Sequence, residues 1–80
     1  MTEEKTKESD VGPYSFSGTF EEAKMGEIFI VEENKEYIPY MKIKSIVTNT
    51  GQIYNAVNIQ KGIPAYFIPL KDVFLKTKYI

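Results

Sequence analysis

The sequence predicts an all-β fold with five short antiparallel strands and one short helix near residues 19–25. We expect a small barrel or curled sheet, comparable in size with SH3-like or OB-like barrels. Apolar and polar residues alternate over much of the chain after the helix, and turn residues interrupt this pattern at spacings of about ten residues. The chain has 80 residues, of which 42% are hydrophobic, so one small domain over residues 11–80 is expected.

The beginning of the chain predicts a tail, a lead-in segment and the helix. Residues 1–10 (MTEEKTKESD) are highly charged and lack apolar periodicity, so we expect a flexible tail. Residues 11–20 mix glycine and proline with aromatic residues, which favours a loop or a short edge strand. Thr19 and Glu22 have the spacing of a capping box, and Gly26 can close the helix after one or two turns.

Turn residues separate the five expected strands. The first strand is a continuous apolar run, the second and third alternate, and Pro64 and Pro69 restrict the fourth. Asn49 and Gly51 suit the turn after the second strand, because both residue types accept left-handed backbone angles. The expected strands are 27–32, 37–47, 52–60, 63–70 and 72–79.

The alternation also predicts two faces. The almost wholly apolar register is the expected core, and it comprises Met41, Ile43, Val47, Ile53, Val57, Ile59, Tyr66, Ile68, Val73 and Leu75. The other register should face solvent, and it includes Tyr40, Lys42, Lys44, Tyr54, Asn58, Phe67, Phe74, Lys76 and Lys78. Asn55 falls in the apolar register, where an unpaired buried amide costs about 1–3 kcal/mol. We therefore expect Asn55 to pair with loop backbone groups or to lie at a β-bulge, in preference to binding a ligand.

The residue inventory argues against catalysis. The chain contains no cysteine and no histidine, which removes disulfides, thiolate metal sites and imidazole ligands. Ser15, Ser17 and Ser45 have no identifiable base, and the five glycines stand singly at turns instead of forming a phosphate-binding loop. We expect no enzymatic activity, no metal and no cofactor.

Charge and hydropathy bear on location and self-association. No apolar run is long enough to cross a membrane and the charged start does not resemble a signal peptide, so a cytoplasmic protein without a membrane partner is expected. Residues 11–36 carry a net charge of -4 and residues 37–80 carry +5. This asymmetry and the outward aromatic residues predict a homodimer, to which strand 72–79 would contribute if it forms a sheet edge.

Two groups of side chains are candidate binding sites. An acidic cluster could mimic a row of phosphates and occupy the nucleic-acid groove of a host protein, and it comprises Glu21, Glu22, Glu27, Glu32, Glu33 and Glu36. The alternative is an aromatic and lysine face for single-stranded nucleic acid, formed by Tyr40, Lys42, Lys44, Tyr54, Asn58, Phe74, Lys76 and Lys78. All ten basic residues are lysines, and the lack of arginine argues against sequence-specific duplex recognition. Both groups also have an ordinary interpretation as solvated turns and strand surfaces.

Four segments between residues 20 and 73 (FEEAKMGEIFIV, YMKI, NAVNIQKG and AYFIPLKDV) resemble a pattern in small phage-encoded β-rich accessory proteins. The matching positions are Gly26, Phe29, Lys42, Ile43, Ala56, Val57, Asn58, Gly62, Phe67 and Val73. The chain departs from the pattern at Ile59, where leucine is more usual, and in the VTNTGQIY insertion. The resemblance implies a non-enzymatic protein that binds and modulates a host protein, such as one of the transcription or nucleic-acid machinery, and it transfers no catalytic residue.

Overall fold

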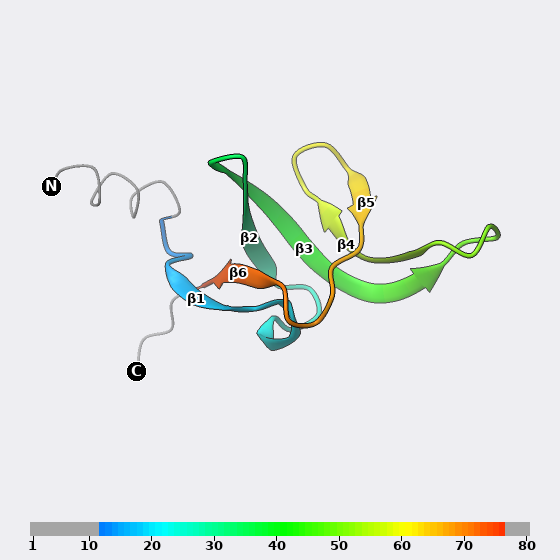
Figure 1. Cartoon of the computed structure of the whole chain (residues 1–80), viewed down its shortest axis with the longest axis horizontal. Helices are drawn as coiled ribbons and strands as arrows, with labels where there is room; N and C mark the ends of the chain where they lie inside the picture. The colour runs from blue at the N-terminus through cyan, green and yellow to red at the C-terminus, as the bar shows by residue number, and fades with distance from the viewer. Residues whose placement is uncertain (1–11, 77–80) are drawn as a thin grey trace, which may run out of the picture.

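The computed structural model describes residues 12–76, which form one antiparallel sheet of six strands (Figure 1). The elements are β1 (Phe16–Thr19), the 3-10 helix η1 (Phe20–Glu22), β2 (Ile28–Glu33), β3 (Glu36–Val47), β4 (Ile53–Asn58), β5 (Ile63–Ala65) and β6 (Asp72–Leu75). The strand order is β1-β6-β2-β3-β4-β5, so β6 lies between β1 and β2 and is not the sheet edge considered for strand 72–79. The all-β antiparallel prediction is confirmed, whereas the described strands form an open sheet with edges at β1 and β5. The expected tail over residues 1–10 and Lys78 lie outside the described residues.

The predicted helix is a single 3-10 turn. Glu22 Oε1 accepts hydrogen bonds from the Thr19 backbone N–H at 2.8 Å and from the Thr19 hydroxyl at 3.4 Å, as the capping-box spacing predicted. The turn ends at once because Ala23 has extended backbone angles, and its N–H donates to the Phe20 carbonyl. Phe20 and Ala23 are buried, so η1 packs down on one face of the sheet.

Tight turns connect β2 to β3, β3 to β4 and β4 to β5. Asn34 and Lys35 have φ angles of 51° and 67°, which is the two-residue turn geometry that suits the right-handed twist of a hairpin. The expected turn at 48–51 is confirmed, because the Gly51 N–H donates to the Thr48 carbonyl and Gly51 has a φ of 89°. Between β4 and β5, the Gly62 N–H donates to the Asn58 carbonyl at 2.6 Å.

The core lies on one face of the sheet and is rich in aromatic rings. Its buried members are Phe20, Ala23, Phe29, Val31, Tyr40, Ala56, Phe67, Val73 and Leu75. The Phe29 ring lies within 6 Å of three other rings, with centroid distances of 5.3 Å to Phe20, 5.7 Å to Phe67 and 5.9 Å to Tyr40. The segment after β5 returns across this face at residues 66–71, and backbone hydrogen bonds join it to the start of η1.

The prediction of which face of β3 and β4 is buried was wrong. Tyr40, Asn58 and Phe67 are buried, although the alternation placed them outside. The apolar register lies on the opposite face in these strands, and its members there are Met41, Ile43, Val47, Ile53, Val57 and Ile59. Tyr66 and Ile68, also predicted to be core, are exposed, whereas the prediction for Val73 and Leu75 is confirmed. The register follows from β2, because fully buried Phe29 pairs with Tyr40 and places it on the core face.

Asn55 lies opposite a bulge of β3 and pairs with backbone groups, as expected. Its Nδ2 donates to the Phe67 carbonyl and its Oδ1 accepts from the Phe67 N–H, both at 2.9 Å. The β3–β4 pairing steps from Lys42↔Ala56 to Ile46↔Tyr54, so Asn55 alone lies opposite residues 43–45. The two hydrogen bonds of the Asn55 side chain thus take the place of backbone pairing between strands, and they anchor the 66–71 connection to β4.

Candidate functional site

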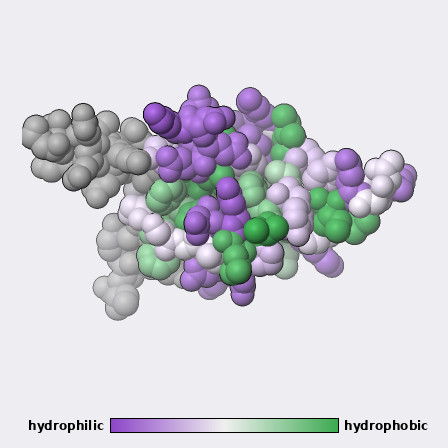
Figure 2. Space-filling model, in the orientation of Figure 1, coloured by the Kyte–Doolittle hydropathy of each residue, from purple (hydrophilic) through white to green (hydrophobic). Residues whose placement is uncertain are grey.

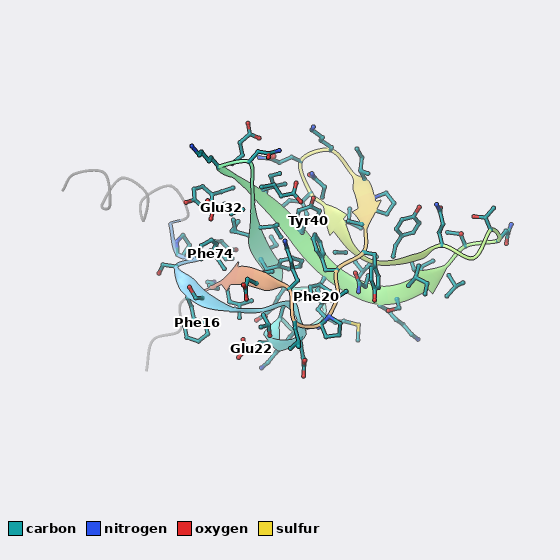
Figure 3. All side chains as sticks on the ribbon, in the orientation of Figure 1. Phe16, Phe20, Glu22, Glu32, Tyr40 and Phe74 are labelled. Atoms are coloured by element: carbon teal, nitrogen blue, oxygen red, sulfur yellow. The ribbon has the colours of Figure 1, made fainter. Side chains whose placement is uncertain are left out.

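The predicted acidic cluster is divided into two groups at opposite ends of β2. Glu21, Glu22 and Glu27 surround η1, and Glu32, Glu33 and Glu36 flank the β2–β3 turn. Figure 3 shows the separation through Glu32, which is labelled above β6, and Glu22, which is labelled below it. Glu22 and Glu27 accept backbone hydrogen bonds within their own turns. At the β2–β3 hairpin, Glu33 and Glu36 pair across the strands, whereas alternation places Glu32 on the opposite face of β2.

Two residues of the predicted nucleic-acid face are in the core. Tyr40 contacts the rings of Phe29 and Phe67, and Asn58 Oδ1 accepts from the Gln60 and Lys61 backbone N–H groups. Burial, followed by the charge of Glu33, raises the pKa of the Tyr40 hydroxyl above its ordinary value of 10.0, and a hydrogen bond with the Asn58 side chain acts in the opposite direction. Neither side chain can stack on a base in this arrangement.

Lys42 has a structural role in place of the expected phosphate contact. Its Nζ donates to the carbonyls of Ala23 at 2.8 Å and Phe20 at 3.2 Å. The same ammonium lies 4.5 Å from the centroid of the Phe20 ring, within range of a cation–π interaction. Lys42 therefore fastens the 3-10 turn to the sheet.

The other described members of that predicted face are dispersed. The Tyr54 hydroxyl donates to Gln52 Oε1 at 2.8 Å, and the half-buried Phe74 ring contacts Tyr37 on the side of the sheet opposite the core. Lys44 and Lys76 are both exposed, but Lys44 lies in β3 whereas Lys76 follows the end of β6. The structure does not bring the predicted aromatic and lysine residues together on one face.

A different surface is both exposed and apolar. Beyond Lys42, β3 has no neighbour but β4 among the described strands, and the two form an arm that projects from the sheet (Figure 1). On the core side of this arm Ile46 pairs with Tyr54, and Tyr54 and Tyr66 line a depression of about 440 Å³. Gly51, Gln52 and Ile53 complete its lining, so no charged residue borders it.

The 66–71 connection extends this apolar surface away from the arm. Tyr66, Ile68 and Leu70 are 53%, 58% and 71% exposed. Figure 2 shows hydrophobic side chains over this connection and along the arm. We name the set Ile46, Tyr54, Tyr66, Ile68 and Leu70 the arm surface.

Sequence reasoning did not find the arm surface. It assigned Tyr66 and Ile68 to the core and attached no role to Ile46 or Leu70. The available signal was the pair Pro64 and Pro69, because two prolines within six residues break a strand and leave an exposed connection.

Comparison of the chain with protein-family models, with curated proteins and with solved structures finds no match. Residues 12–76 contain no group of three or more acidic, histidine or cysteine side chains placed to hold a metal ion. The same part of the chain has no helix long and apolar enough to span a membrane.

Proposed function

We propose that this chain is a non-enzymatic, phage-type accessory protein of the host cytoplasm that binds and modulates a host protein through the arm surface. The observation that carries the proposal is the exposure of Tyr66, Ile68 and Leu70 beside an uncharged depression. Apolar surface gathered in this way is typical of sites that bind another protein. Support also comes from the resemblance of four segments of the sequence to the pattern of small phage-encoded proteins.

The chemistry of the arm surface defines the partner's contact region. The lining offers Ile53, two tyrosines and the uncharged Gln52 but no charge, so a mainly apolar segment of the host protein is the expected occupant. Burying one leucine or isoleucine side chain contributes about 1.5–3 kcal/mol, so Ile68 and Leu70 together could supply much of a micromolar affinity. The exposed hairpin acids Glu33 and Glu36 would favour a basic partner, such as a host protein that handles nucleic acid.

The proposal is tested by affinity capture from host lysate with the full-length chain as bait. The key variant is Ile68→Ser with Leu70→Ser, and the matched control is Ile63→Ser, because Ile63 is similarly exposed at 56% but lies on β5. Circular dichroism verifies the fold of each bait. We expect a stoichiometric partner with the wild type and the control, and about 100-fold weaker binding by the double variant.

Two outcomes would contradict this function. Equal capture of the partner by the double variant would remove the arm surface from the interaction. Tight binding of a single-stranded oligonucleotide that falls steeply with salt would favour the alternative nucleic-acid function instead, because phosphate contacts release counterions.

A further inference from the structure

The sheet face opposite the core is apolar in its centre. Strand alternation and pairing place on it Ile28, Ile30, Tyr37, Pro39, Met41, Ile43, Val57 and Phe74, and we name this set the outer face. Ile30 is 8% exposed and the others are half-buried. All six described strands belong to one sheet and η1 packs on the core side, so no described strand or helix covers the outer face.

Charged residues lie at the two ends of the outer face and have opposite signs. β2 and β6 are antiparallel with Ile30 opposite Phe74, so alternation places Glu32 and Asp72 together at one end. Lys76 follows Phe74 by two residues and therefore lies at the other end of β6, where it is exposed. The acidic end contains a cleft of about 540 Å³, lined by Ser17, Gly18, Thr19, Glu32, Lys71, Asp72, Val73 and Phe74. The two carboxylates outnumber the single ammonium group of Lys71, so this end keeps a net negative charge. Figure 3 shows Glu32 and Phe74 close to each other at this end.

We propose that the outer face binds a second copy of this chain face to face. The two copies are related by a two-fold axis that lies in the plane of the interface and runs perpendicular to the strands. This axis places the acidic end of each copy over the basic end of the other, so Lys76 of one copy faces Glu32 and Asp72 of its partner. An axis parallel to the strands would instead oppose like charges. The apolar centres then pack as in aligned sheet-on-sheet contacts.

The extent of the outer face suits a weak dimer. Four strands spaced by about 4.8 Å and about six residues of about 3.3 Å each give a footprint of roughly 400 Å². Two copies would therefore bury roughly 800 Å² in total, which is the size of a weak or transient interface, so we expect a dissociation constant of roughly micromolar order or weaker. The arm surface lies on the core side and stays free in this dimer, so the inference does not rest on the proposed function.

Sedimentation velocity of the full-length chain from low to high micromolar concentration tests the dimer. The wild type should dimerise with increasing concentration. Lys76→Glu should raise the dissociation constant about 10-fold, because two symmetry-related charge pairs become repulsive. Adding Asp72→Lys to Lys76→Glu should restore dimerisation, whereas Lys61→Glu, the same charge change on the β4–β5 turn, should leave it unchanged.

Three results would overturn the inference. The first is that the wild type stays monomeric at every concentration. The second is that Lys76→Glu does not weaken the dimer. The third is that only the double variant Ile68→Ser with Leu70→Ser weakens it. Lys76 is exposed, so its variants should fold, and circular dichroism checks this. A monomer that still captures a host partner would refute the dimer alone.

Discussion

Replacing Lys42 with methionine tests how the 3-10 turn is fastened to the sheet. The substitution keeps an unbranched side chain of similar reach and removes the ammonium group. Lys42 Nζ makes two hydrogen bonds, to Ala23 and Phe20, and lies over the Phe20 ring. A hydrogen bond from a charged donor contributes about 1.5–3 kcal/mol and a cation–π contact about 0.5–1 kcal/mol. The site is only partly buried and the methionine retains apolar contact, so we expect a net loss of about 2–3 kcal/mol.

Urea unfolding followed by circular dichroism measures this loss. With an m-value of about 1 kcal/mol/M, the midpoint for Lys42→Met should fall by about 2–3 M. The matched control is Lys44→Met, because Lys44 is an exposed lysine two residues away on the same strand. The control should change the free energy of unfolding by less than about 0.5 kcal/mol. Equal midpoints for the two variants would refute the structural role of Lys42.

Three further perturbations test the structure at other points. Gly18→Ala should lower the free energy of unfolding by about 1–3 kcal/mol, because the added Cβ would lie 2.5 Å from Glu22 Oε1 and 2.6 Å from Leu75 Cδ1. A thermal midpoint equal to that of the wild type would contradict this. Asn55→Ala should lower the free energy of unfolding by about 1–3 kcal/mol and speed hydrogen exchange at the Phe67 amide, because that amide loses its acceptor. An unchanged exchange rate would exclude that contact. The free energy of unfolding should fall as pH rises above about 10. The raised pKa of Tyr40 means that the hydroxyl stays protonated in the folded state at a pH where the unfolded state has lost the proton. Tyr40→Phe should reduce this fall.

Local signals in the sequence identified most turns and strand positions. The Thr19–Glu22 capping box, the turn at 48–51 and the glycine after Lys61 occur where the sequence places them, because each depends on residues within a few positions. The alternative of an edge strand for residues 11–20 is likewise consistent with β1. Helix length was overestimated, since Ala23 adopts extended angles immediately after one turn.

Burial in β3 and β4 depends on contacts distant in sequence. Both registers of β3 contain large apolar side chains, such as Tyr40 in one and Met41 in the other, so alternation alone favoured the wrong face. Pairing with β2 decides the register, since Phe29 is fully buried opposite Tyr40. This reversal also explains why the nucleic-acid face is not assembled and why an apolar register lies outside.

The measurement closest to the central claim is a chemical-shift titration of the isotopically labelled chain with its captured host partner. If the arm surface binds the partner, amide shifts should concentrate at Ile46, Tyr54, Tyr66, Ile68 and Leu70, and saturate at one partner per chain. Shifts confined to the β2–β3 hairpin around Glu33, or to the exposed lysines, would contradict the claim.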